Sequence, residues 1–372
     1  MTKMRFIDRF VEESNQQREL LRRLATSNIP SYIFGAGVFA YVLVKFLEKN
    51  GIKVTAAIVD QNYLSQPSFI DLPLVALEDT VSQGAGCHIF IGVTNYPAIT
   101  EKLRALGFIN VHLIDIPDYL DMPNRFITRA FVEENLSQLE EAHSLLCDQK
   151  SKDTFIASLN TKLSEDLKHI ESLVSLDHIY FPSTEFGTTD AEDFLDVGGF
   201  TGDTVKEFHH LKNGKYNRII SLEPSEENFT RLQNNALELD KSKIICCKVG
   251  AWHERTRLSF VTKDGDIDNE ISEAGDAEIQ VDTIDNIVSH IGGKISLMKL
   301  DINGAEYNAL LGATKTIQEN HPRIITRLHR KEDYFRIPVL LKRIAPEIKI
   351  YIRQRNYMSM MIILYAEFES RA

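Results

Sequence analysis

A glycine-rich turn bounded by two carboxylates is the part of this chain best suited to hold a nucleotide-like ligand. An apolar run ends at Asp196 and passes directly into the turn, and the next apolar run ends at Glu223. The residues of the turn and of the helix start that we predict to contact the ligand are Gly198, Gly199, Gly202, Asp203 and Thr204. Glycines let backbone N–H groups approach a ligand, and the N-terminus of the following helix adds partial positive charge. A strand-end carboxylate such as Glu223 suits the two hydroxyls of a ribose.

Two cofactors compete for this pattern, a dinucleotide and S-adenosylmethionine (SAM). A dinucleotide turn has its third glycine inside the helix and a neutral strand end, whereas here Asp196 stands just before the glycines. A carboxylate at that point suits the ammonium group of SAM, and Glu223 suits its ribose. We therefore predict that SAM is the cofactor. The remaining alternative is a turn whose glycines and acids serve packing alone.

Candidate proton acceptors follow two later strands. One predicted strand leads into Asp301 and Glu306, and another ends at His329. Open α/β sheets bind ligands at the carboxyl ends of their strands, so these side chains should gather near the cofactor, and we predict that Asp301 also contacts it. A hydroxyl that attacks a methyl group needs a group to take its proton, and we predict His329 or Asp301 for this role. The alternatives are a histidine that is only hydrogen-bonded at a strand end and an aspartate that only caps a helix.

Together these motifs resemble the FkbM family of SAM-dependent O-methyltransferases, over roughly residues 178–368. The first motif of that family, D-x-G-x-x-x-G-D-T, is present from Asp196 to Thr204, and its K-x-D-x-E-G-A-E turn corresponds to Lys299–Glu306. Asn303 stands where the family usually has glutamate, which removes one negative charge beside the expected reaction centre. The resemblance implies methyl transfer to a hydroxyl. The implied acceptor is a sugar or glycan first, and a polyketide or other small molecule next.

The C-terminal half is predicted to be a Rossmann-like α/β domain with the class I SAM methyltransferase fold. A short connection over 353–357 joins the last two strands, so they should form an antiparallel hairpin on an otherwise parallel sheet. The seven predicted strands are 193–197, 218–222, 243–248, 295–300, 323–328, 348–352 and 358–365, and 257–262 with 278–281 add a ribbon.

The N-terminal half has a second, smaller Rossmann-like pattern. The spacing of apolar residues predicts an amphipathic helix over 4–25, which should pack on a domain or on a second subunit of a homo-oligomer. A strand then leads into Gly35-Ala36-Gly37, and a second strand over 54–59 closes on Asp60. The order of these motifs resembles the nucleotide-sugar-binding domain of some bacterial sugar acyltransferases. NAD binding and a purely structural domain are the alternatives, and the structural one is favoured.

These patterns divide the chain into three parts. We predict an N-terminal helix and Rossmann-like domain over 1–117, a helical linker over 118–177, and the methyltransferase domain over 178–372. The linker has no glycine between 118 and 176, and its apolar residues recur three and four apart. The front domain is expected to contribute no group to methyl transfer.

Composition narrows the possible partners. The net charge of −11 argues against nucleic acid as substrate, because phosphate binding needs clustered Lys and Arg. No run of about 18 apolar residues occurs, and the first residues lack the apolar core of a signal peptide, so a cytoplasmic location is expected. No metal is predicted, and an acidic loop is interpreted as solvated: Asp264, Asp266, Asp268, Glu270, Glu273, Asp276 and Glu278. The alternative function is an NAD- or nucleotide-sugar-binding protein on a methyltransferase frame without transfer activity.

Overall fold

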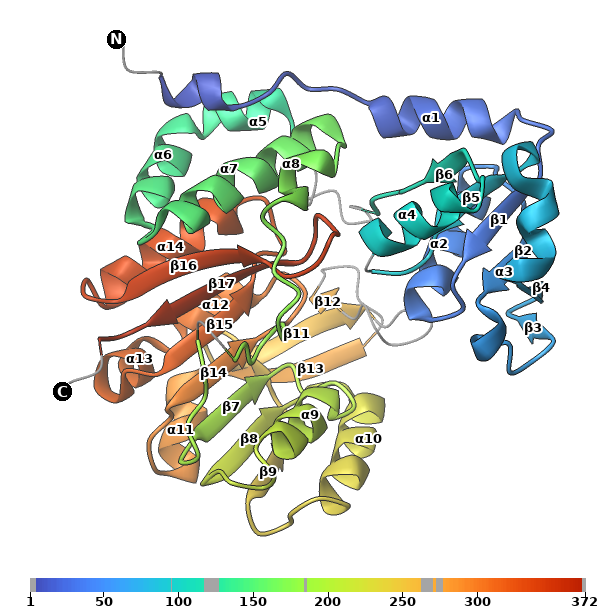
Figure 1. The fold of residues 1–372 in the computed structure, drawn as a ribbon. Coiled ribbons are helices and arrows are strands. Elements are labelled where there is room, and N and C mark those ends of the chain that lie inside the picture. The colour runs from blue at the N-terminus through green and yellow to red at the C-terminus, as the bar shows by residue number, and fades with distance from the viewer. Residues whose placement is uncertain are drawn as a thin grey trace. The chain divides into compact units, whose positions relative to one another are not determined.

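A computed structural model describes residues 5–94, 96–116, 127–183, 186–261, 270–271 and 277–369. The chain forms two compact units (Figure 1). The N-terminal unit comprises 1–131, 156–174 and 356–361, and the C-terminal unit comprises 132–155, 175–355 and 362–372. Helices α5 (Arg129–Glu134) and α7 (Gln149–Ser164) each contribute residues to both units.

The C-terminal unit is built on a seven-stranded sheet with the order β16-β17-β15-β14-β7-β8-β9. Strand β17 pairs antiparallel with both of its neighbours, while β15, β14, β7, β8 and β9 pair in parallel. This confirms the predicted fold class, including the antiparallel last strand. The strands are β7 (Asp193–Val197), β8 (Arg218–Leu222), β9 (Ile244–Cys247), β14 (Leu297–Leu300), β15 (Arg323–Arg327), β16 (Lys349–Gln354) and β17 (Ile362–Glu367).

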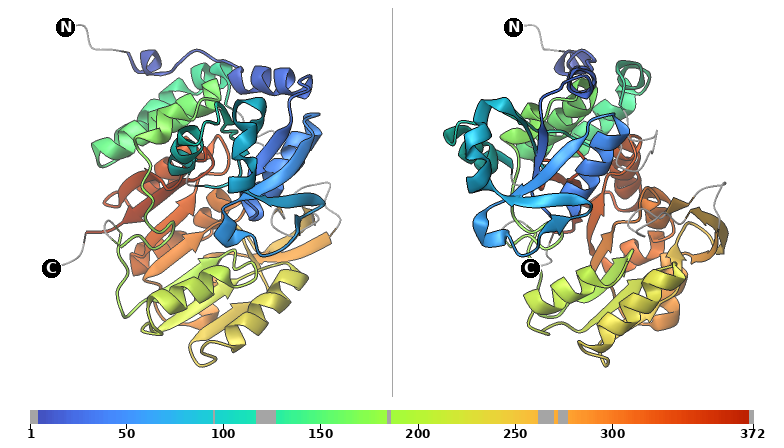
Figure 2. Two further views of the ribbon diagram at one scale, coloured as in Figure 1. Left: turned by 45° about the vertical axis from the view of Figure 1, so that its right-hand side comes forward. Right: turned by 90° about the vertical axis from the view of Figure 1, so that its right-hand side faces the viewer.

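Helices cover both faces of this sheet (Figure 2). Crossovers between parallel strands are right-handed, so the helices that lead from β7 toward β9 and those that lead from β14 toward β16 lie on opposite faces. Phe181, Phe194 and Phe208 pack together in the core beneath the first of these faces. The helices of the unit are α6 (Leu136–Leu145), α9 (Asp203–Leu211), α10 (Glu226–Leu237), α11 (Ile284–Ile291), α12 (Glu306–Leu311), α13 (Thr314–Asn320) and α14 (Asp333–Ile344).

A second, four-stranded sheet contains the predicted ribbon. Its order is β10-β13-β11-β12, and β11 and β13 pair antiparallel as expected. The strands are β10 (Gly250–Ala251), β11 (Thr256–Val261), β12 (Glu270–Ile271) and β13 (Ala277–Asp282). In the predicted acidic loop, Asp264, Asp266, Asp268, Glu273 and Asp276 lie outside the described residues.

The prediction that the last strand begins at Met358 was wrong, because β17 begins at Ile362. The Asn356 side chain accepts a hydrogen bond from the Met358 N–H at 2.9 Å, and the Met361 N–H donates to the Met358 carbonyl at 3.0 Å. These bonds form a turn. Tyr357 within it packs edge-on against Tyr96 of the N-terminal unit, to which this connection belongs.

The N-terminal unit has a six-stranded sheet in the order β3-β4-β2-β1-β5-β6, parallel except for the β3–β4 pair. The pair β3 and β4 was not predicted, because Pro73 lies inside β4 and proline is unusual within strands. The strands are β1 (Ser31–Phe34), β2 (Val54–Val59), β3 (Ser68–Phe69), β4 (Leu72–Ala76), β5 (His88–Ile91) and β6 (Asn110–His112). The helices are η1 (Phe6–Arg9), α1 (Gln16–Ala25), α2 (Val38–Lys49), η2 (Gln61–Tyr63), α3 (Leu77–Thr80), η3 (Val81–Gly86), α4 (Tyr96–Ala105) and α8 (Lys168–Glu171).

The single helix predicted over 4–25 was wrong, because the chain forms η1 and α1 with a non-helical segment between them. In that segment the Val11 N–H donates to the Asn160 side chain at 3.1 Å, and the Ser14 N–H donates to the Leu163 carbonyl at 3.0 Å. Both acceptors belong to α7. Tertiary hydrogen bonds therefore replace the helical ones that the apolar spacing favoured.

The glycine turn of the N-terminal unit lies where its strand order reverses, between β1 and β5. Gly35 has φ +119°, and a Cβ there would lie 2.8 Å from the Gly92 carbonyl oxygen. Asp60 at the end of β2 forms an ion pair with Lys102 of α4. This strand-end acid thus has a partner within the protein, which agrees with the favoured structural interpretation of this domain.

A histidine pair gives the N-terminal unit a pH-dependent stability. His88 Nδ1 lies 3.0 Å from His112 Nε2, and burial lowers the pKa of His112 to about 4 and also lowers that of His88. Because the folded pKa lies below the unfolded value near 6.5, stability is complete above about pH 6.5 and is lost as the pH falls toward 4. We expect a loss of roughly 1–2 kcal/mol over this range.

His112→Gln should flatten the pH profile of thermal unfolding. The control His210→Gln, at an exposed histidine, should keep the profile of the parent. Equal pH profiles in the parent and both variants would contradict the assignment.

The predicted domain boundaries remain predictions. Residues 117 and 118, where the first boundary was placed, lie outside the described part of the chain. The segment predicted as a linker is shared between the two units: residues 132–155 pack within the C-terminal unit and residues 156–174 within the N-terminal unit. None of the described helices combines the length and the apolar character that a bilayer crossing requires.

Candidate active site

The glycine turn after β7 is possible only because two of its residues lack a Cβ. Gly198 has φ +88°, and a Cβ there would overlap the backbone oxygen of Asp301. A Cβ on Gly199 would overlap the hydroxyl of Ser221. Gly202, also at φ +88°, precedes the first residue of α9 and provides no side-chain cap. The turn therefore packs closely against the chain that leaves β14 and against β8.

The first residues of α9 differ in their exposure. Asp203 is exposed in the first turn of the helix, where a carboxylate complements the helix dipole. Thr204 is buried. The structure thus brings the five predicted residues of the turn and helix start together at the carboxyl end of β7.

Asp196 lies beneath the turn, fully buried. Its carboxylate is 3.0 Å from Lys299 Nζ and accepts a hydrogen bond of 2.9 Å from the Ser221 hydroxyl. Lys299 also donates to the Gly198 carbonyl oxygen at 2.8 Å. Burial raises the pKa of Asp196, and the Lys299 ammonium opposes this shift. The Asp196 carboxylate is thus occupied by the protein, and it fixes the end of β7 to β8 and β14.

Glu223 supports the same turn from the end of β8. Its carboxylate accepts hydrogen bonds of 2.9 Å from the N–H groups of Phe200 and Ser225. The side chain is buried, and burial raises its pKa to about 7 despite these two bonds. Glu223 therefore lies at the predicted strand end, directly against the glycine turn.

The turn after β14 is held by Glu306, the first residue of α12. One carboxylate oxygen accepts the Ile302 N–H at 2.8 Å, and the other accepts the Gly304 N–H at 2.9 Å. Between them Asn303 adopts φ +50°, a left-handed conformation that asparagine tolerates better than most residues. The backbone of this turn thus gives a physical reason for asparagine at position 303.

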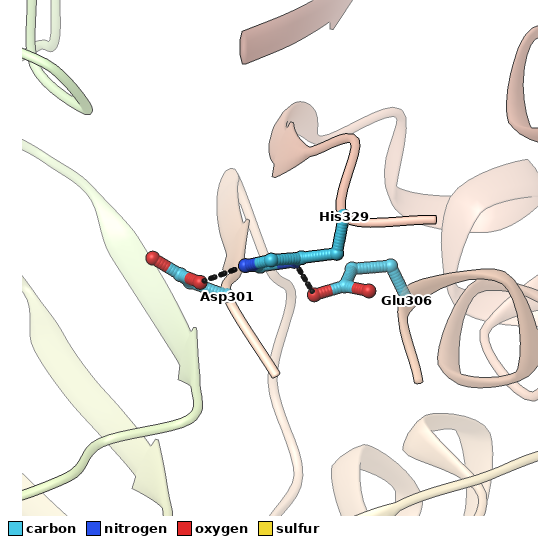
Figure 3. Close-up of side chains that lie close together, drawn as sticks. All are labelled: Asp301, Glu306 and His329. Atoms are coloured by element: carbon cyan, nitrogen blue, oxygen red, sulfur yellow. Dashed lines mark hydrogen bonds and ion pairs between the residues drawn. The ribbon is translucent and has the colours of Figure 1, made fainter. Parts of the chain in front are cut away.

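His329 lies between two carboxylates just beyond the end of β15 (Figure 3). Its Nδ1 is 2.7 Å from Glu306 Oε1, and its Nε2 forms an ion pair with Asp301 Oδ1 at 3.2 Å. Only the doubly protonated ring can donate from both nitrogens. Burial alone would lower the pKa of His329, but Glu306 and Asp301 outweigh burial and raise it. The imidazolium is the favoured form in this arrangement.

Asp301 has two further partners that the sequence did not reveal. Tyr180 donates its hydroxyl to Asp301 Oδ2, and Arg327 Nη1 lies 3.3 Å from the same oxygen. Burial alone would raise the pKa of Asp301, but Arg327, His329 and Lys299 together hold it well below its usual range. Tyr180 precedes the sheet by sequence and Arg327 ends β15, so only the fold brings them together.

The same cluster is the place among the described residues where a metal ion could be held. Asp301, Glu306 and His329 each place one possible ligand atom within 4.8 Å of the others. The histidine ring, however, already bridges the two carboxylates, and Arg327 also pairs with Asp301. The positive charge of the imidazolium fills the place of a cation here. We therefore keep the prediction of no bound metal.

The family model of the methyltransferase FkbM domain matches residues 196–358. The C-terminal half of the chain carries an FkbM methyltransferase domain. Its matched region begins at Asp196 and includes every predicted site residue, together with Lys299 and Arg327. Tyr180 lies ahead of the matched region, although its hydroxyl reaches Asp301.

One solved structure with a TM-score above 0.5 supports the fold of the chain. The methyltransferase FkbM from Methylobacillus flagellatus KT is 21% identical with a TM-score of 0.63, over 95% of this chain and 94% of that one. Fibrillarin from Aeropyrum pernix, in complex with natively bound S-adenosyl-L-methionine, is 9% identical with a TM-score of 0.34, over 49% of this chain and 70% of that one. No curated protein matches the chain.

Proposed function

We propose that this protein is a SAM-dependent methyltransferase that transfers a methyl group to a hydroxyl of a sugar, glycan or other small molecule. The observation that carries the proposal is the match of the FkbM domain to the segment that builds the glycine turn and the strand ends beside it. The sugar or glycan acceptor rests on the family resemblance. NAD is disfavoured by the acidic end of β7 and by the antiparallel β17.

The residues at the ends of β7 and β8 fit SAM. The glycine turn leads directly into the N-terminus of α9, and Glu223 offers a strand-end carboxylate for the ribose hydroxyls. Exposed Asp203 adds a negative charge beside them. Because Asp196 is buried and paired with Lys299, we assign it to positioning the turn, and its predicted direct contact with the ammonium group remains untested.

SAM, when bound, supplies an electrophilic methyl group with an excellent leaving group. The remaining tasks of the protein are to align the acceptor and to give its proton a destination. Asp301 and His329 lie together at the ends of β14 and β15, the first and second strands beside β7. Each is held by charged partners, so alignment is the firmer part of the proposal, and the proton acceptor is the part that needs a direct test.

Binding of SAM, measured by titration calorimetry, should depend on Glu223. Loss of a charge-assisted hydrogen bond costs about 1.5–3 kcal/mol, so Glu223→Gln should weaken binding by roughly 10- to 150-fold. Because the pKa of Glu223 is raised to about 7, affinity in the parent should also increase as the pH rises through 7 and the carboxylate ionises. The variant should lack this increase.

Glu226→Gln is the matched control, because Glu226 lies on the same connection but is exposed and paired with Lys248. It should bind SAM as the parent does. Melting temperatures of both variants would reveal whether Glu223→Gln has only loosened the turn. Unchanged SAM affinity in folded Glu223→Gln would show that the ribose contact is assigned wrongly, and no SAM binding by the parent would refute the proposed function.

A further inference from the structure

Arg330 is a cation at the active-site edge without a paired anion. It follows His329 and is half-buried. Its side chain passes over the turn after β14, where a Cβ on Gly304 would lie 2.5 Å from Arg330 Nε. Gly304 has φ +96°, so the glycine both permits the turn and leaves room for the arginine. In the described part of the chain the guanidinium has no hydrogen-bond or ion-pair partner.

The neighbouring charges are already matched with one another. Arg327 and His329 pair with Asp301, His329 also pairs with Glu306, and Lys299 pairs with Asp196. Two carboxylates follow Arg330 closely along the chain, Glu332 and Asp333, and Asp333 accepts the Arg330 backbone N–H at 2.7 Å.

Asp333 does not neutralise the guanidinium fully. Burial and the nearby Glu306 raise the pKa of Asp333 to about 7, so near neutral pH it is only partly ionised. A half-buried guanidinium with five N–H donors and an incomplete counter-charge is suited to a ligand anion.

The strand order assigns this cation to the acceptor and not to the cofactor. Arg330 follows β15, and β14 separates β15 from β7 in the sheet. The residues that fit SAM follow β7 and β8, on the far side of β14. A group bound by Arg330 would therefore lie on the β14 and β15 side of the glycine turn, beside the candidate proton acceptors Asp301 and His329.

We propose that Arg330 binds an anionic group, a carboxylate or a phosphate, carried by the methyl acceptor. This inference rests on the proposed function and narrows its acceptor to acidic molecules, such as an acidic sugar or a sugar phosphate. Arginine suits both anions because its planar fork forms two parallel hydrogen bonds with either. A neutral acceptor would leave the guanidinium half-buried and unmatched.

Binding of small anions tests the proposal without knowledge of the true acceptor. Glucuronate, glucose 6-phosphate and neutral glucose would be titrated by calorimetry into the full-length protein saturated with S-adenosylhomocysteine. We expect at least one of the two anions to bind 10-fold or more tightly than glucose. Arg330→Gln should remove that preference, and Arg330→Lys should retain part of it. The anion that binds identifies carboxylate or phosphate as the recognised group.

Arg343→Gln is the matched control, because Arg343 is an exposed arginine on α14. It should keep the preference of the parent. Absence of any anion preference in the parent, or an equal preference in folded Arg330→Gln, would overturn the inference. Transfer of labelled methyl to glucose as fast as to the anionic sugars would also overturn it, while leaving the proposed function intact. Failure of the parent protein to bind SAM would instead refute the proposed function. The anion titrations would then be carried out on the protein without S-adenosylhomocysteine.

Discussion

Lys299→Met is expected to lower the free energy of unfolding of the C-terminal unit by about 3–5 kcal/mol, or roughly 10 °C in melting temperature. Lys299 is buried with its ammonium 3.0 Å from the fully buried Asp196 carboxylate. Removal of the lysine leaves this carboxylate with the Ser221 hydroxyl alone. An unpaired buried charge is much more costly than the absence of the whole pair. Differential scanning calorimetry at neutral pH would measure the loss.

Two further variants make this test specific. Lys315→Met changes an exposed lysine that lies 3.8 Å from Glu319 one helical turn away, and its effect should stay below about 0.5 kcal/mol. Asp196→Leu combined with Lys299→Met removes both buried charges and should be more stable than Lys299→Met alone. If the double variant lost more free energy of unfolding than the two single variants together, pairing of these charges would not be the cause of the loss.

The same pair shows what the sequence could predict at this site. Asp196 and Glu223 were placed correctly at strand ends, because each of them closes an apolar run of strand length. The sequence did not show that Lys299 would neutralise Asp196, since their contact depends on the parallel register of β7 and β14. Burial of Asp196 follows from that register, and it is the reason why we propose a supporting role for Asp196, whose contact with the cofactor stays a prediction.

The second polar turn was predicted in position but not in its network. Asp301, Glu306 and His329 were expected at neighbouring strand ends, and the structure brings them together. Tyr180 and Arg327 were missed as partners of Asp301, because one precedes the first strand of the sheet and the other is the last residue of a neighbouring strand. Their convergence on one carboxylate is a tertiary effect without a local signal. It changes the expected chemistry, because Arg327 helps to hold the pKa of Asp301 low, whereas Glu306 and Asp301 raise the pKa of His329.

His329→Ala is expected to lower kcat by about 10²-fold or more while leaving SAM affinity unchanged, whether His329 takes the proton or holds the acids in place. The exposed His210→Ala on α9 is the matched control and should leave turnover unchanged. Both would be measured by transfer of labelled methyl to a confirmed acceptor. The loss alone therefore locates the site but does not assign the role.

The direction of the pH dependence separates these roles. If His329 is the base, the neutral ring is required, and turnover should rise with pH through a pKa above the ordinary value near 6.5. If the imidazolium positions Asp301 and Glu306, turnover should fall as the pH rises through the same pKa. Stability should decrease there in either case. The folded pKa is raised, so the stabilisation is complete below about pH 6.5 and is lost as the pH rises through the folded pKa.

A base role for Asp301 would give a third pH dependence of turnover, because the pKa of Asp301 lies well below the usual range. If Asp301 takes the proton, the parent should keep its activity down to acidic pH, and Asp301→Asn should show the loss of turnover with SAM binding intact. Loss of SAM affinity in Asp301→Asn would instead indicate that this carboxylate supports the cofactor turn, whose Gly198 packs against the Asp301 backbone. Near-normal turnover in both His329→Ala and Asp301→Asn would remove a protein base from the mechanism. Catalysis would then rest on alignment of the hydroxyl with the methyl group. Such alignment alone can give a large rate enhancement, because it raises the effective molarity of the reacting groups.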